Sequence, residues 1–128
     1  MCPDHERHAP YGDAMVLIEA YIKPFKLDDV KEALEEIGVG GITISEVMQA
    51  APSRGRGRSF GAPGTPSDMV PKMRIEIAAP AKLAEVIIEA LRLHGSAGKH
   101  EDGRIVVIPM QGAVRIRTGE QDSEALTT

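Results

Sequence analysis

The sequence has almost no cysteine and few aromatic residues. Its one cysteine, Cys2, cannot form a disulfide within the chain, and a metal site built from several cysteines is excluded. A chain of this kind is typical of a reducing compartment, so we expect a cytoplasmic protein. Aromatic residues make up 3% of the chain, and tryptophan is absent. Because nucleic-acid bases stack on such side chains, this composition disfavours a base-stacking surface.

An excess of basic residues and a long apolar run are also missing. The 128 residues include 15 Lys and Arg against 19 Asp and Glu, and the formal net charge is -4. General nucleic-acid binders need a basic surface, so we expect no nucleic-acid partner. No stretch reaches the ~18 apolar residues of a membrane span, and the polar N-terminus lacks the apolar core of a secretory signal. The length fits one soluble domain.

Apolar periodicity predicts the order strand, helix, strand, twice over. Alternating or continuous apolar residues predict four strands, over 15–22, 41–47, 72–77 and 105–110. Apolar residues at helical spacing predict a helix over 28–37, in which Asp29 and Glu32 would form a capping box. A second helix is predicted between Pro80 and Gly95.

The two halves of this pattern resemble one another. Counted from Pro24 and from Pro80, leucine, valine and a further apolar residue recur at the same offsets, which indicates a weak internal duplication. A βαββαβ order folds into one antiparallel sheet with both helices on the same face, the ferredoxin-like α+β arrangement. Several strands are apolar on both sides, so the uncovered face predicts self-association.

Proline and glycine set the expected domain boundaries. We expect a flexible tail over 1–14, one domain over 15–122 and a C-terminal tail over 123–128. Cys2, His5 and His8 are possible metal ligands in the first tail, but no closely packed partner set accompanies them, so no metal site is expected.

A long loop over about 48–68 separates the two halves. It contains three prolines and four glycines, and loops of this length in a small domain are functional or disordered. Arg54, Arg56 and Arg58 alternate with glycine and form a basic patch in an acidic protein. Such a patch suits an acidic partner, a nucleotide or RNA, and the alternative is a solvated connector without a ligand. Both interpretations remain open at this point.

Two arginines near the C-terminus suggest an anion site. The segment 114–120 alternates apolar and basic residues, so in an extended strand Arg115 and Arg117 would leave the backbone on one side, roughly 7 Å apart. Neighbouring guanidinium groups repel unless an anion lies between them, and a phosphate chain matches their geometry. The alternative is that they pair with carboxylates such as Glu120 or Glu101, or simply point into water.

Catalysis is not expected from this sequence. His94 ends a predicted helix and His100 lies in a polar loop, and neither has an evident nucleophile and orienting carboxylate beside it. The alternative of another class is an RNA-binding ferredoxin-like domain, which the acidic balance and the sparse aromatic residues disfavour.

Several segments together resemble the PII signal-transduction family. They lie at 20–34, with its Lys-Pro-Phe-Lys-Leu-Asp-Asp-Val motif, and at 41–47, 70–77, 98–99, 102–104 and 115–120, with its Arg-Ile-Arg-Thr-Gly-Glu motif. The resemblance runs from about Met15 to Asp122. It implies a homotrimer of ferredoxin-like subunits that binds ATP or ADP in clefts between neighbours. The long loop would be the family's T-loop, which contacts a target protein.

The resemblance also assigns roles to individual residues. The adenine would be lined by Thr43, Glu76 and the backbone at Ala78. Asp102, Gly103 and Arg104 would form a loop around the ribose and phosphates, in which Gly103 leaves backbone N–H groups accessible.

The phosphates would be clamped from two subunits. Arg104 would act from one side, and Arg115 and Arg117 would come from the neighbouring subunit. The family usually has glycine at the position of Glu101 and lysine at that of Arg104. The extra carboxylate of Glu101 favours a less charged nucleotide, ADP or AMP, over ATP.

The T-loop departs from the family pattern. The usual Gly-Phe-Gly-Arg-Gln run is replaced over 49–53, and Ser53 stands where the family's glutamine helps to hold magnesium and 2-oxoglutarate. This weakens the expectation of magnesium, although Lys72 matches the family's oxoglutarate-contacting lysine. Thr65 replaces the tyrosine that receives a uridylyl group, so that modification is chemically unavailable.

These departures favour an atypical, PII-like member. Relatives with unusual T-loops, including carboxysome-associated ones, respond to bicarbonate and to ADP or AMP, and this chain resembles them more than the nitrogen sensors. We therefore expect inorganic-carbon sensing and control of a membrane transporter or a metabolic enzyme. The alternative is a nitrogen-regulatory PII protein that responds to ATP and 2-oxoglutarate.

Overall fold

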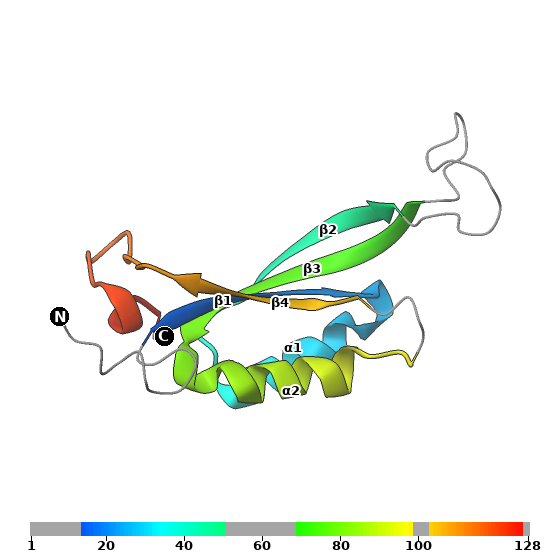
Figure 1. The fold of residues 1–128 in the computed structure, drawn as a ribbon, viewed down its shortest axis with the longest axis horizontal. Helices are drawn as coiled ribbons and strands as arrows, with labels where there is room; N and C mark the ends of the chain where they lie inside the picture. Colours follow the sequence, from blue (N-terminus) through cyan, green and yellow to red (C-terminus); the bar gives the residue numbers. More distant parts are fainter. Residues whose placement is uncertain (1–13, 51–68, 99–102, 127–128) are drawn as a thin grey trace.

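Four antiparallel strands form one sheet in the order β2-β3-β1-β4, and two helices cover one of its faces (Figure 1). The computed structural model describes residues 14–50, 69–98 and 103–126. The elements are β1 (Met15–Ile22), α1 (Leu27–Ile37), β2 (Thr43–Ala50), β3 (Met69–Pro80), α2 (Ala84–Gly95) and β4 (Ile105–Met110). The predicted ferredoxin-like α+β fold is therefore confirmed.

Some sequence-based predictions concern positions outside the described residues. These are the tail residues 1–13 and the positions Arg54, Arg56, Arg58, Ser53, Thr65, His100, Glu101 and Asp102. Within the described ranges, no helix is long and apolar enough to cross a membrane.

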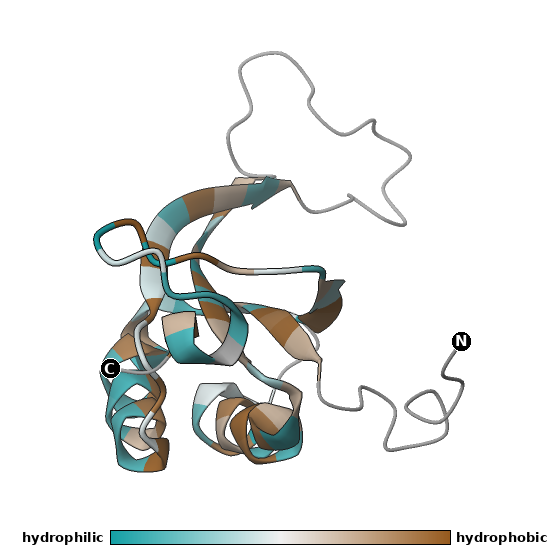
Figure 2. Cartoon of the chain, turned by 90° about the vertical axis from the view of Figure 1, so that its left-hand side faces the viewer, coloured by the Kyte–Doolittle hydropathy of each residue, from teal (hydrophilic) through white to brown (hydrophobic). Residues whose placement is uncertain are grey.

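The core lies between the sheet and the two helices, which Figure 2 shows side by side beneath the strands. Every second residue of β1 points into it, and Ile18 lies opposite Ile77 of β3, with both side chains fully buried. From the helices, the fully buried Val30, Leu34 and Ile87 complete the centre. Burying a side chain of this size stabilises the fold by about 1.5–3 kcal/mol.

Short 3-10 turns, Pro24–Lys26 and Ala81–Leu83, lead into the two helices, and the first one replaces the predicted capping box. Lys26 is the N-cap residue of α1, its backbone is already helical, and no side chain caps it. A capping residue needs extended backbone, whereas Asp29 lies inside the helix, so the predicted capping box is wrong. The helix ends at Gly38, whose φ of 90 degrees suits glycine.

Strands β2 and β3 extend beyond the rest of the sheet as a two-stranded ribbon (Figure 1). β1 pairs with β3 only from Met73 to Pro80, whereas β2 pairs with β3 from Met69 to Glu76. The strand predicted over 41–47 therefore begins and ends later, and its last residues occupy positions assigned to the long loop. The ribbon leads into segment 51–68.

Candidate functional site

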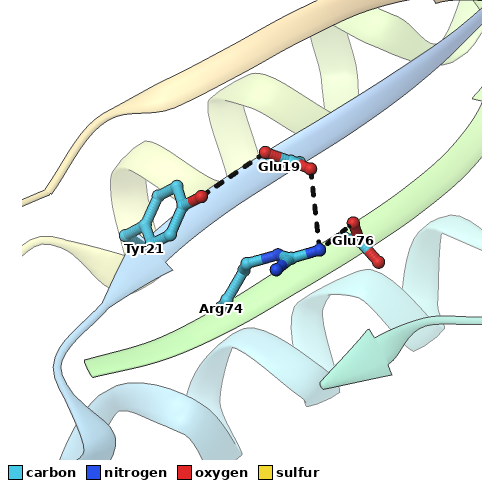
Figure 3. Close-up of polar contacts among 4 residues, drawn as sticks. All are labelled: Glu19, Tyr21, Arg74 and Glu76. Carbon is cyan, nitrogen blue, oxygen red and sulfur yellow. Dashed lines mark hydrogen bonds and ion pairs between the residues drawn. The ribbon is translucent and has the colours of Figure 1, made fainter. Parts of the chain in front are cut away.

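A polar cluster lies on the sheet face that the helices leave open (Figure 3). Arg74 of β3 forms an ion pair and hydrogen bond with Glu76, and its Nη2 lies 3.8 Å from Oε2 of Glu19 on β1. The Tyr21 hydroxyl donates a hydrogen bond of 3.5 Å to Oε1 of Glu19. The Arg74 guanidinium group thus lies within ion-pair distance of two carboxylates.

The hydrogen bond between Arg74 and Glu76 shifts the pKa values of these two side chains. It lowers the pKa of the Glu76 carboxyl below its usual range, and the same contact raises the pKa of the Arg74 guanidinium. Glu76 is therefore an ionised hydrogen-bond acceptor at neutral pH.

The three residues expected to line adenine lie together on this open face. Thr43 of β2 is directly opposite Glu76 of β3. Ala78 follows two residues later on the same strand, so its side chain points to the same face. The structure thus brings a hydroxyl group, a carboxylate and a small side chain into one surface region.

Gly103 is fixed by packing against β1. A Cβ atom added at Gly103 would lie 2.1 Å from the carbonyl oxygen of Tyr21, so no larger residue fits without a backbone shift. The next residue, Arg104, accepts a hydrogen bond of 3.3 Å from the Tyr21 N–H through its backbone carbonyl. Close backbone approach therefore gives this glycine a structural role besides the predicted access to phosphate.

A cavity of about 240 Å³ lies where β1, the end of α2 and the start of β4 meet. Its lining includes Tyr21, Ser96, Gly103 and the exposed Arg104. The segment expected to contact phosphates thus borders an open space rather than the core.

The predicted extended strand over 114–120 is wrong. Residues 116–118 form a turn, across which the Arg115 N–H donates to the Glu120 carbonyl at 2.8 Å. The Gly119 N–H donates to the Arg115 carbonyl, also at 2.8 Å, and Gly119 has a φ of 78 degrees. The Thr-Gly turn chemistry overrides the alternating pattern, so the estimated spacing of the two arginines does not apply.

The two arginines have different surroundings. Arg115 Nε lies 2.9 Å from Oε1 of Glu120 as an ion pair rather than an aligned hydrogen bond, so the contact with a carboxylate is present in the single subunit. Arg117 is exposed and makes no ion pair with the other described residues. Val114 and Ile116, which alternate with them, are 63% and 100% exposed.

The C-terminal segment is folded back rather than extended away. Asp122–Leu126 forms a 3-10 helix, η5, where the sequence suggested the start of a tail. Arg115 Nη2 donates a hydrogen bond of 3.1 Å to the Glu124 carbonyl, and η5 contacts β3. Arg115 therefore helps to hold the end of the described chain.

The two sets of expected phosphate ligands lie at opposite ends of the sheet. Arg104 precedes β4, whose first residue Ile105 is opposite Ala20, whereas Arg115 follows β4, whose last residue Met110 is opposite Met15. A strand of this length spans roughly 17 Å, and Figure 1 shows the C-terminal segment at the far end from the start of β4. One subunit therefore does not bring Arg104 and Arg115 to one ligand.

Lys72 is buried, with 3% of its surface exposed, and lies opposite Val47 at the base of the ribbon. It borders a cavity of about 330 Å³ that Pro24, Met48 and Pro71 also line. The acidic residue Glu46 lines the same cavity. No group of His, Cys, Asp and Glu among the described residues is arranged to hold a metal ion.

Glu19, Tyr21 and Arg74 were not predicted as parts of a site. Strand alternation places them on one face, but their meeting depends on the register between β1 and β3, in which Tyr21 lies opposite Arg74. The only sequence signal was charged and polar residues at alternate positions of two otherwise apolar strands.

The structure is a ferredoxin-like domain with a polar cluster on its open sheet face, with Arg104 before β4 and Arg115 and Arg117 after it. The family model described as nitrogen regulatory protein P-II matches residues 15–120. The chain therefore belongs to the P-II family of signal-transduction proteins, and it is a regulator rather than an enzyme.

Curated relatives of similar length support this assignment. The nitrogen regulatory protein P-II of Haemophilus influenzae is 41% identical over 112 residues, which are 88% of this chain and 100% of that protein. The protein of the same name from Azospirillum brasilense is 42% identical, and the P-II 1 protein of Escherichia coli K12 is 38% identical, over the same shares.

A solved structure confirms the fold. The Bacillus subtilis GlnK–ATP complex superposes with a TM-score of 0.77 at 24% identity, and the match covers 89% of this chain and 97% of that one. At this identity the likeness concerns the fold.

Proposed function

We propose that this P-II protein forms a homotrimer, binds an adenine nucleotide in the clefts between subunits and controls a target protein through its T-loop. The observation that carries the proposal is the separation of Arg104 from Arg115 and Arg117 along β4. A phosphate chain that needs both sets must receive them from two subunits. The relative solved with ATP supports nucleotide as the ligand.

The nucleotide would lie with its base near the open face of β2 and β3. Thr43 and the ionised Glu76 offer hydrogen-bond partners, and Ala78 leaves space for a flat ring. The phosphates of the nucleotide would contact Gly103 and Arg104 of that same subunit, together with its Glu101 and Asp102. Arg115 and Arg117 of the neighbour would then neutralise the remaining negative charge.

Exposed apolar side chains support the self-association. Val114 and Ile116 flank the two arginines and face solvent in the single subunit, and Ile108 on the open sheet face is also exposed. A neighbouring subunit that receives Arg115 and Arg117 would cover these side chains at the same time.

The preferred nucleotide and the second effector follow from the departures in the sequence. We propose that Glu101 favours ADP or AMP over ATP, since a carboxylate near the phosphates opposes their charge. Bicarbonate is our proposed second effector, with Lys72 near the T-loop base and Arg54, Arg56 and Arg58 within the T-loop as candidate contacts to the effector or partner. Because Ser53 replaces the glutamine, magnesium is not part of the proposal.

A nitrogen-regulatory function is the second candidate. It is favoured by the names of the three curated relatives described above, each called a nitrogen regulatory protein P-II, at 38–42% identity. In that case ATP and 2-oxoglutarate would replace ADP and bicarbonate. In either case the protein acts in the cytoplasm, and its target is a membrane transporter or a metabolic enzyme.

Calorimetry with ATP, ADP and AMP, each with and without bicarbonate and 2-oxoglutarate, separates the two candidates. Bicarbonate that tightens the binding of ADP or AMP supports carbon sensing. A 2-oxoglutarate effect that needs ATP supports the nitrogen alternative instead. Absence of binding by every adenine nucleotide contradicts the proposed function.

Mixed oligomers test whether the site lies between subunits. Arg104→Ala and Arg117→Ala each remove one side of the clamp, so each variant alone should bind nucleotide weakly. Co-expression of the two variants should restore tight binding in about one quarter of the clefts, because those clefts combine two intact halves. A mixture that binds no better than either variant places both arginines in one subunit's site and contradicts the proposal.

A further inference from the structure

Arg115 is held in place by its own subunit through two different nitrogens. Nε is 2.9 Å from Oε1 of Glu120, and Nη2 donates to the Glu124 carbonyl at 3.1 Å. Because the guanidinium group is planar and rigid, the hydrogen bond at Nη2 and the carboxylate close to Nε together restrict where the group can lie.

Glu120 is itself fixed by the turn that it closes. The Thr118 hydroxyl lies 3.0 Å from Oε1 of Glu120 and also accepts a hydrogen bond of 3.3 Å from the Glu120 N–H. The backbone bond between Arg115 and Glu120 adds a third restraint. The Glu120 carboxylate is therefore held by contacts within its own turn. Arg117 on the same turn is exposed and lacks such a partner among the described residues.

We propose that Glu120 is a positioning residue for the nucleotide phosphates. It holds Arg115 in the orientation in which it reaches the cleft of the neighbouring subunit, and its own charge opposes the most highly charged phosphate chain. This inference rests on the proposed nucleotide-binding function and assigns a nucleotide-selecting role within that site.

The positioning role follows from the cost of ordering a long side chain. An unrestrained arginine must lose its rotamer freedom when it meets the phosphates, at roughly 0.5–1.5 kcal/mol for one side chain. Glu120 imposes that order before the ligand arrives. The charge of Glu120 acts in the opposite direction, since a carboxylate close to the arginine competes with phosphate for it.

Two substitutions separate these effects. Glu120→Ala removes both the support and the charge, so ADP affinity should fall roughly 3- to 10-fold, which is the ordering cost of one arginine side chain. Glu120→Gln keeps an oxygen acceptor at the same length and removes only the charge. We expect it to recover ADP binding to within about 2-fold of the wild type, and to raise the affinity for ATP relative to that for ADP.

The control is Asp122→Asn, which removes the same charge two residues away. Asp122 has a φ of 59 degrees, a conformation that asparagine also tolerates, and its side chain takes no part in holding Arg115. Its ADP affinity and its ATP-to-ADP affinity ratio should stay within about 2-fold of the wild type, because the competing charge must lie beside the arginine.

Calorimetry on the assembled protein decides the matter. Equal ADP affinity of the wild type and Glu120→Ala, or an unchanged ATP-to-ADP affinity ratio in Glu120→Gln, overturns the positioning role while the proposed function stands. If Glu120→Ala does not assemble, Thr118→Val removes the hydroxyl beside the carboxylate and should weaken ADP binding about 3-fold; unchanged binding then overturns the inference. A wild type that binds no adenine nucleotide overturns the proposed function itself.

Discussion

Replacing Gly103 with alanine should damage both stability and nucleotide binding. The added Cβ would lie 2.1 Å from the Tyr21 carbonyl oxygen and 3.0 Å from the Tyr21 Cβ. The obstacle is backbone of the central strand β1, so it cannot rotate away as a side chain would. The loop must move instead, and it would carry Arg104 with it and strain the hydrogen bond between the Tyr21 N–H and the Arg104 carbonyl.

The magnitude follows from the cost of inserting a methyl group into a filled space. Such overpacking destabilises proteins by about 1–3 kcal/mol, and loss of one backbone hydrogen bond adds about 1 kcal/mol. Thermal unfolding at a fixed subunit concentration measures the change, because oligomers melt in a concentration-dependent manner. The ADP affinity of the variant, measured below its melting temperature, should fall as well.

The matched control is Gly41→Ala, since a Cβ at Gly41 meets no atom within 4 Å. Its unfolding free energy should change by less than about 0.5 kcal/mol, as is usual for surface positions. A Gly103→Ala protein as stable as Gly41→Ala, with unchanged ADP affinity, would refute the argument that close packing against Tyr21 selects this glycine.

Two further predictions concern the open face and the core. Arg74 lowers the pKa of Glu76 in the folded protein, so this pair stabilises the fold above the ordinary carboxyl pKa, and the contribution is lost as the pH falls through the lowered value. Melting temperatures between pH 7 and pH 3 should therefore fall less steeply in Arg74→Met, and equal slopes would contradict the assignment. Ile77→Ala removes a fully buried side chain of β3 from the core between the sheet and the helices and should cost about 2–5 kcal/mol in denaturant unfolding. Val86→Ala on the exposed side of α2 is its control and should cost less than about 1 kcal/mol.

Strand periodicity predicted β1 and β4 with their observed bounds, because their apolar residues begin and end with the strands. β2 was predicted too short at its far end. Its last residues are held by pairing with Met69–Lys72 of β3, and that pairing depends on the register between two segments separated by the long loop. The local sequence alone does not predict such a register.

The turn explains why the alternating pattern predicted the wrong positions for Arg115 and Arg117. Alternation over 114–117 is typical of a strand, but a strand needs a partner, and Val114 pairs only in an isolated bridge with Gln121. Thr118 and Gly119 close the turn first, since the hydroxyl bonds locally and glycine accepts a positive φ. In the sequence, the Thr-Gly dipeptide indicates a turn, whereas the alternating apolar and basic residues indicate a strand.

The different surroundings of Arg115 and Arg117 predict different consequences of their loss. Arg115→Ala removes the ion pair with Glu120 and the hydrogen bond that holds η5, so it should lower both the melting temperature and ADP affinity. Arg117→Ala removes an exposed side chain and should leave the melting temperature of the ligand-free protein within about 2 °C of the wild type. Its ADP affinity should still fall by about 1–3 kcal/mol, the worth of a charged hydrogen bond.

Comparison of the two variants isolates the phosphate contact. For Arg115→Ala the affinity loss mixes a lost contact with a loosened C-terminal segment, whereas for Arg117→Ala it reports the contact alone. The ligand-free melting curves and the ADP titrations should therefore rank the variants differently. If both variants melt at the wild-type temperature, Arg115 does not hold η5 in solution, and the support attributed to Glu120 has no structural consequence. If Arg117→Ala binds ADP as tightly as the wild type, the neighbouring subunit supplies at most one arginine to the phosphates.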